Sequence, residues 1–136
     1  MHQIVIEYEG ELRTRAKHLQ SGNEILTDAP LDNHGKGEAF SPTDLIAAAL
    51  GSCILTIMGI AAASRGLDLL GTHTEVNKIM GNNPRRISDL QLKIYFKKNF
   101  AYKERKILET AAYSCPVHQS LNADMTIDII FHYPNP

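Results

Sequence analysis

The stretch SPTDLIAAALGSC, residues 41–53, decides the fold, because it opens a long apolar helix with a clear start signal. Ser41 is a favoured N-cap residue, Pro42 suits the first helical position, and Asp44 completes a short capping box. The apolar pattern runs on to Arg65-Gly66, where a cation followed by a glycine predicts the end of the helix. The sequence therefore predicts a helix over residues 42–65, about 36 Å long at roughly 1.5 Å per residue.

This predicted helix is apolar nearly all round, which indicates burial on all sides. A chain of 136 residues forms a single domain over residues 1–136 and is too small to surround such a helix well. We therefore expect a second subunit to help cover it. A membrane span is not expected, because the small residues of this run suit a tightly packed soluble helix.

Strands are predicted on both sides of this helix. Three precede it, over residues 2–9, 12–19 and 24–28, and an exposed loop over 29–39 follows them. After the helix, the patterns predict a strand over 71–79, a strand with clean alternation over 90–97, a helix over 101–113 that Pro116 breaks or restarts, and a strand over 125–132. The predicted class is therefore α+β, with the element order βββα–ββαβ.

The composition limits which binding partners and which cellular compartment we expect. The net charge is −1 and no basic stripe stands out, so no nucleic-acid partner is expected. The first residues lack the pattern of a signal peptide. We expect a cytoplasmic protein, in which two cysteines indicate catalysis or inert burial rather than a structural bridge.

The two cysteines, Cys53 and Cys115, form a dithiol if the fold brings them together, and a dithiol can reduce a substrate and close into a disulfide. Cys115 precedes Pro116, which favours Cys115 as the N-cap of a new helical turn, with a lowered thiol pKa. The alternative is a small residue packed before a proline, since free cysteines are often simply buried.

Cys53 lies about three turns inside the helix, too far from its N-terminus for the dipole to activate the thiol. A cation from another segment is needed, and the candidates are Arg13, Arg15 and Lys36. Without one, Cys53 is a packing residue of an alanine-rich helix.

Two carboxylates and one histidine are the remaining candidate site residues. Asp44 is nine residues before Cys53, on the opposite side of a straight helix, which favours a capping role. Glu38, in the preceding loop, is the rival carboxylate. His118 follows Cys115 by three residues and suggests a Cys/His nucleophile pair or half of a metal site, although the zinc signal is weak. No metal and no cofactor is expected.

Taken together, the motif from Ser41-Pro42 to Gly51-Ser52-Cys53 and the later Cys115-Pro116-Val117 resemble the OsmC/Ohr family, the osmotically induced and organic hydroperoxide resistance proteins. The chain is similar to the broader OsmC-like branch over nearly its whole length. The resemblance implies an intertwined homodimer with two long helices at its centre. It also implies a stress-response, antioxidant peroxidase that acts on organic hydroperoxides.

In that reading Cys53 is the peroxidatic thiolate, which becomes a sulfenic acid, and Cys115 resolves it as a disulfide that an external dithiol reduces. Arg15 or Arg13 would activate Cys53. The chain departs from the organic hydroperoxide members, which carry a glutamate directly after the motif proline. Thr43 stands there, and the acid comes one place later, as Asp44.

Two alternatives remain open. The first is a small-ligand-binding protein on the same fold, with an apolar pocket at the dimer interface and little or no peroxidase activity; the Thr43 departure favours it. The second is a Cys115/His118 hydrolase or acyltransferase, which lacks an evident oxyanion motif in the sequence.

Overall fold

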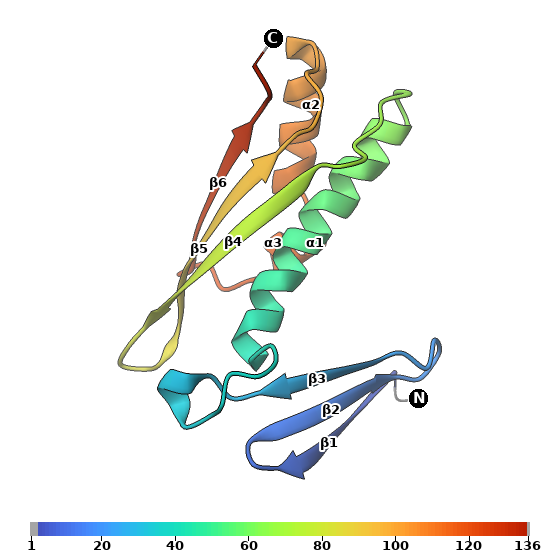
Figure 1. The fold of residues 1–136 in the computed structure, drawn as a ribbon. Helices are drawn as coiled ribbons and strands as arrows, with labels where there is room; N and C mark the ends of the chain where they lie inside the picture. The colour runs from blue at the N-terminus through green and yellow to red at the C-terminus, as the bar shows by residue number, and fades with distance from the viewer. Residues whose placement is uncertain (1–2, 136) are drawn as a thin grey trace. The chain divides into compact units, whose positions relative to one another are not determined.

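The computed structural model describes residues 3–135, so the first residue of the predicted 2–9 strand, His2, lies outside the described part. The chain divides into two compact units, residues 1–46 and 47–136, and each is described by itself (Figure 1).

The N-terminal unit contains an antiparallel sheet of three strands. They are β1 (Ile4–Gly10), β2 (Arg13–His18) and β3 (Glu24–Asp28), in the order β1-β2-β3. All three predicted strands are confirmed, with ends that differ by no more than two residues. The predicted loop over 29–39 holds one short 3-10 turn, η1 (Leu31–Asn33).

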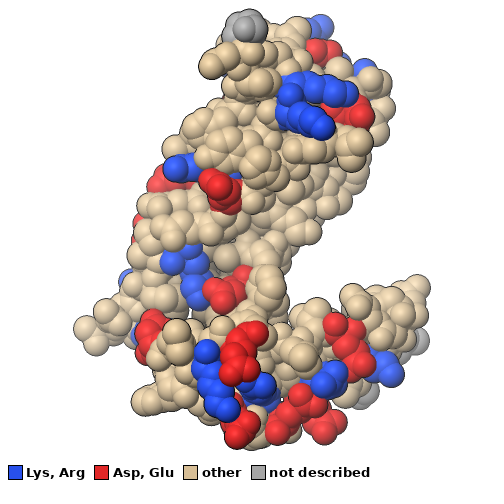
Figure 2. Space-filling view, in the orientation of Figure 1, with Lys and Arg blue, Asp and Glu red and all other residues tan. Residues whose placement is uncertain are grey.

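The two faces of this sheet differ in chemistry. The register aligns Ile6, Ala16 and Ile25 on one face, where Ile6 is 65% exposed and Ile25 is 45% exposed. The other face carries charged side chains from all three strands, and Figure 2 shows blue and red atoms interleaved over this unit. An apolar face this exposed in one protomer indicates that something covers it.

Helix α1 (Pro42–Ala63) has the predicted caps at both ends. The Ser41 amide donates to Oδ2 of Asp44 at 2.9 Å, and the Asp44 amide donates to Oγ of Ser41 at 3.1 Å, which completes the capping box. At the C-terminus, Gly66 has a φ of +69°, and the amide of Leu67 donates to the carbonyl of Ala62 at 2.9 Å. This is the pattern of a Schellman motif, which needs a left-handed residue at the position of Gly66.

One chain alone does not bury α1 on all sides, as expected for a chain too small to surround it, and cover by a second subunit stays a prediction. One stripe is buried, formed by Ala47, Leu50, Gly51, Ile54, Met58 and Ala62. The opposite side leaves Ile46 40% exposed and Ile60 63% exposed. By length and composition α1 is the one described helix that passes a test for a membrane span, but the core helix of a soluble protein passes the same test.

The C-terminal unit is a sheet with helices on one face. Its elements are β4 (His73–Gly81), β5 (Arg86–Tyr95), α2 (Tyr102–Tyr113), α3 (Pro116–Ser120) and β6 (Thr126–His132). The order is β4-β5-β6, with β4 antiparallel and β6 parallel to β5. A parallel pair needs a crossover connection, and α2 and α3 supply it.

The core of this unit lies between α1, α2 and the covered face of the sheet (Figure 1). Leu90, Leu92 and Ile94 alternate with exposed or half-buried residues along β5, as predicted. Leu108 and Ala112 are buried on the predicted inner face of α2. Gly51 lets α1 approach β4 closely, because a Cβ built there would be 3.2 Å from side-chain carbons of Thr74 and Val76.

Candidate functional site: a dithiol

The fold brings the two cysteine thiols together. Cys53 projects from α1 and Cys115 stands at the start of α3, and the Cys53 thiol is close enough to the Cys115 thiol to raise its pKa. Both cysteines are free, and both belong to the apolar cluster of the C-terminal unit. The arrangement is a reduced dithiol that can close into a disulfide.

Cys115 is the N-cap of α3, as the following proline predicts. Its sulfur accepts a hydrogen bond from the main-chain amide of His118 at 3.2 Å, and the amide of Val117 also donates to it. The predicted lowering of the Cys115 pKa is nevertheless wrong. Burial removes the sulfur from water and raises the pKa, the two amides oppose this effect, and the neighbouring Cys53 adds to it.

Cys53 has the more open position of the two. It is partly exposed, whereas Cys115 has 0% of its surface exposed. On α1 it lies next to Ala49, one turn before it, and Thr56, one turn after it, and both are exposed. Cys53 is therefore the thiol that keeps some exposed surface in one chain, and Cys115 is the one that keeps none.

Arg13, one of the three predicted activating cations, forms ion pairs with carboxylates of the N-terminal unit. Its Nη2 atom is 2.7 Å from Oε2 of Glu38 and 3.4 Å from Oδ2 of Asp28. The hydrogen bond and charge of Glu38 raise the pKa of Arg13 above its ordinary value. Asp28 is buried and also accepts the main-chain amide of Glu38 at 2.9 Å.

Asp28 is a partner of Arg13 that sequence reasoning missed. It lies directly opposite Arg13 in the register of β2 and β3, so correct pairing of the two predicted strands would have found it. Among the described atoms, Nε of Arg13 and Oδ1 of Asp28 are buried without a hydrogen-bond partner. Buried groups of this kind are uncommon, and they mark this network as more than a surface ion pair.

The other two cation candidates are engaged on the surface of the same unit. Arg15 pairs with Glu9 at 2.9 Å and with Glu24 at 3.4 Å, and the hydrogen bond to Glu9 raises its pKa. Lys36 lies 3.8 Å from Glu11. Contact of any of these cations with Cys53 stays a prediction.

The residues at the start of α1 act as caps. Asp44 accepts the Ser41 amide, as the sequence predicts, and the hydroxyl of Thr43 lies 3.2 Å from the hydroxyl of Ser41. A threonine at this position cannot supply the negative charge of the glutamate that organic hydroperoxide members carry there.

His118 contacts Cys115 through its main-chain amide, and its ring packs edge-on against Tyr113 with centroids 6.1 Å apart. Within residues 3–135 no group of three or more His, Cys, Asp or Glu side chains could hold a metal ion. The half metal site suggested by Cys115 and His118 therefore gains no further ligand from the described chain.

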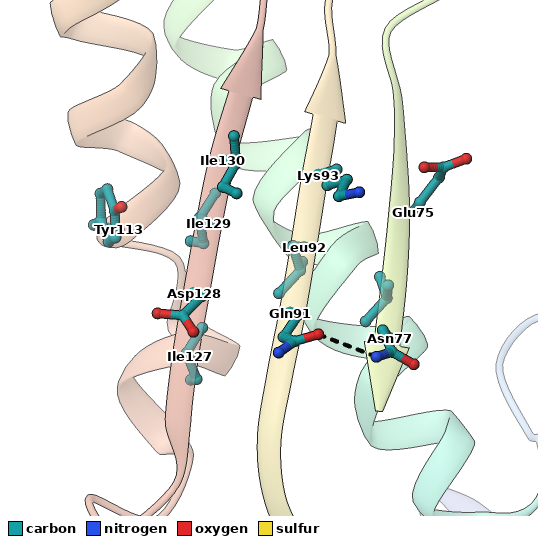
Figure 3. A pocket seen from close by; sticks show the side chains of 11 residues that line it. Glu75, Asn77, Gln91, Leu92, Lys93, Tyr113, Ile127, Asp128, Ile129 and Ile130 are labelled. Carbon is teal, nitrogen blue, oxygen red and sulfur yellow. Dashed lines mark hydrogen bonds between the residues drawn. The ribbon is translucent and has the colours of Figure 1, made fainter. Parts of the chain in front are cut away.

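A cavity of about 640 Å³ lies at a different place in the C-terminal unit, over the outer side of the β4-β5-β6 sheet (Figure 3). Polar side chains line much of it, including Asn77 and Gln91, which are hydrogen-bonded to each other at 3.1 Å. None of the described lining residues is a cysteine. Because two neighbouring thiols can carry redox chemistry, we place the candidate site at Cys53 and Cys115 rather than at this cavity.

Comparison with solved structures finds proteins whose folds match nearly the whole chain. A protein of Psychrobacter arcticus 273-4, named for osmotic stress induction and a detoxification response, is 49% identical over 97% of this chain and 96% of its own, with a TM-score of 0.94. An OsmC like protein from Mycoplasma pneumoniae has a TM-score of 0.82 at 15% identity, over 99% of this chain and 98% of its own. An organic hydroperoxide resistance protein OsmC from Legionella pneumophila has a TM-score of 0.76 at 12% identity, over 97% and 98%.

The structures from Mycoplasma pneumoniae and Legionella pneumophila share the α+β fold with its two small sheets. No curated protein sequence matches the chain. The family model described as OsmC-like protein matches residues 35–130, a segment that includes the start of α1 and both cysteines. This chain therefore belongs to the OsmC-like protein family.

Proposed function

We propose that this protein is a thiol-dependent hydroperoxide reductase, in which Cys53 reacts with an organic hydroperoxide and Cys115 resolves the product. The observation that carries the proposal is the contact between two free thiols, one partly exposed and one fully buried. The names of family members, such as the Legionella pneumophila protein, point to the same class of substrate.

In the first step the Cys53 thiolate attacks the terminal oxygen of the hydroperoxide. The O–O bond breaks, the alkoxide takes up a proton and leaves as an alcohol, and Cys53 becomes a sulfenic acid. In the second step the sulfur of Cys115 attacks the sulfur of Cys53. The S–O bond breaks, and hydroxide leaves as water with the proton from Cys115. The raised pKa of Cys115 keeps that proton on the thiol until this step.

Arg13 is our candidate for the cation that activates Cys53, ahead of Arg15. Arg13 is half-buried and is held by Glu38 and by the buried carboxylate of Asp28, whereas Arg15 is held by two exposed carboxylates. A cation with restricted motion and restricted hydration acts more strongly on a nearby thiolate than a solvated one. Glu38 takes the role of positioning carboxylate in this proposal, and Asp44 takes only a capping role.

We also propose that the working form is a homodimer and that residues 1–136 form its single domain. The apolar face of the β1-β2-β3 sheet and the open face of α1 both expose isoleucines in one protomer, including Ile6 and Ile60. A second copy offers the same two faces, and closed symmetric dimers are the commonest way to bury them. Two free thiols in contact suit a reducing compartment, which supports a cytoplasmic location and reduction by an external dithiol.

The test is intact-mass measurement and thiol counting on the reduced protein after one equivalent of tert-butyl hydroperoxide. We expect the loss of two hydrogens and of both free thiols. Cys53→Ser is expected to abolish turnover, and Cys115→Ser is expected to allow one oxidation and then stall as the sulfenic acid. Equal turnover by Cys53→Ser and the wild type would rule the proposal out.

The second candidate is a small-ligand-binding protein, and Thr43 in place of the family glutamate favours it. Two free thiols and an unchanged mass after hydroperoxide treatment would support this candidate. Native mass spectrometry of the purified protein would then show a retained small molecule.

A further inference from the structure

We propose that the external dithiol reduces the Cys53–Cys115 disulfide by attacking the sulfur of Cys53, so that Cys115 is the leaving sulfur. The mixed disulfide with the reductant then forms only on Cys53. This inference rests on the proposed function, because it concerns the disulfide that the peroxidase cycle produces.

Access to the two sulfurs is the first argument. Thiol–disulfide exchange depends on which sulfur the attacking thiolate can reach. Cys115 has 0% of its surface exposed and belongs to the same buried cluster as Leu108 and Ala112, whereas Cys53 is partly exposed. A hydroperoxide must reach Cys53 for the first half of the cycle, so the reductant can follow the same approach. No step of the cycle requires an approach from solvent to Cys115.

Two opposing effects act on the stability of the leaving Cys115 thiolate. A thiol of low pKa leaves faster, and burial raises the pKa of Cys115, which by itself disfavours its departure. The amides of Val117 and His118 point at the same sulfur and stabilise its negative charge as it develops. We conclude that access decides the outcome, because a raised pKa slows the exchange while a sulfur without exposed surface cannot be attacked in line.

The electrons and protons balance in two steps. A thiolate of the reductant forms a bond to the sulfur of Cys53, the disulfide bond breaks, and its electron pair moves to Cys115. Cys115 takes up the proton of the reductant's second thiol. That second thiolate then attacks the reductant's own sulfur within the mixed disulfide and expels the Cys53 thiolate. The reductant leaves as a disulfide, and the protein returns to its dithiol state.

The experiment uses a monothiol, which performs the first step and cannot perform the second. The wild-type disulfide is prepared with tert-butyl hydroperoxide and, in parallel, with diamide, which needs no peroxidase activity. A brief exposure to 2-mercaptoethanol is followed by acid quenching, alkylation with N-ethylmaleimide and peptide mass mapping. We expect 2-mercaptoethanol on the peptide with Cys53 and the alkyl group on the peptide with Cys115. The reverse labelling, or equal labelling of both, would overturn the inference.

A pair of single-cysteine variants gives a second measurement. Both variants are loaded with 2-mercaptoethanol in urea and refolded, so that Cys115→Ser carries the mixed disulfide on Cys53 and Cys53→Ser carries it on Cys115. We expect dithiothreitol to reduce the first at least tenfold faster than the second, and equal rates would contradict the inference. A disulfide that forms with diamide but not with hydroperoxide would refute the proposed peroxidase while the labelling still tests this inference. A protein that forms no disulfide with either oxidant would refute both.

Discussion

Arg13 and Asp28 face each other across the β2–β3 ladder, with Nη2 of Arg13 3.4 Å from Oδ2 of Asp28. The carboxylate is buried while the guanidinium is half-buried, and the same carboxylate oxygen accepts the amide of Glu38. The pair therefore joins the sheet to the loop that precedes α1, within the N-terminal unit.

We expect Asp28→Ala to lower the free energy of unfolding by about 1–3 kcal/mol, because it leaves a buried amide and part of a guanidinium without partners. Glu24→Gln is the matched control: it weakens the pair of Arg15 with an exposed carboxylate, where such pairs contribute about 0–1 kcal/mol. Urea unfolding at neutral pH measures both. Equal losses in the two variants would show that the Arg13–Asp28 pair contributes no more than a surface ion pair.

Close packing at Gly51 leads to a prediction about α1. Glycine to alanine inside a helix normally gains up to about 1 kcal/mol of stability. Gly59 has room for a Cβ, because no atom lies within 4 Å of the position apart from its chain neighbours and the nearby backbone of the helix itself. At Gly51 the methyl group would press on Thr74 and Val76. We expect Gly59→Ala to stabilise the protein, Gly51→Ala to gain less, and Gly51→Leu to lose about 1–3 kcal/mol by overpacking.

Thermal unfolding monitored by circular dichroism gives the order of the three glycine variants. A Gly51→Ala variant as stable as Gly59→Ala would mean that β4 moves away from α1 without a penalty.

The order of elements was predictable because its signals are local. The capping box of Ser41 and Asp44 and the glycine at position 66 are short-range patterns: they gave the start of α1 correctly and its end within two residues, at Ala63 rather than 65. Alternation in β5 likewise reports which residues face a core. Strand ends were less accurate: β4 begins at His73 and ends at Gly81 rather than covering 71–79, because strand ends depend on the pairing partner.

The chemistry of the site was less predictable, because it depends on contacts between segments far apart in the chain. The pattern Cys115-Pro116 correctly predicts an N-cap, but the pKa of Cys115 follows from burial in a core that α1 and α2 build. Asp28 escaped notice because its partner is defined by strand register. The same holds for the exposed side of α1. The sequence shows that this side is apolar, but it does not show which chain covers it.

The raised pKa of Cys115 predicts a loss of stability in alkaline solution. The ordinary value is 9.0, and burial keeps the folded thiol protonated to a higher pH than the unfolded one. The unfolded chain therefore loses this proton first. The stabilising effect is fully present below the ordinary pKa and is lost as the pH rises from there through the folded pKa.

Comparing Cys53→Ser with Cys53→Ser/Cys115→Ser isolates this effect, because the other titrating groups are common to both. We expect the free energy of unfolding to fall more steeply above about pH 9 in the variant that keeps Cys115. Ultraviolet absorbance of the thiolate gives the folded pKa directly. Parallel pH profiles for the two variants would mean that Cys115 ionises as easily in the folded chain as in the unfolded one.

The exposed side of α1 tests the proposed dimer. Ile60 is 63% exposed in one protomer, and Ile60→Glu places a charge where a second copy would bury an apolar side chain. In size-exclusion chromatography with light scattering, we expect this variant to elute as a monomer and the wild type to elute as a dimer. The matched control is Ile130→Glu: Ile130 is 52% exposed, and in β6 it lies opposite Lys93, which can pair with the new carboxylate. A dimeric Ile60→Glu variant, or a monomeric Ile130→Glu variant, would move the interface away from α1.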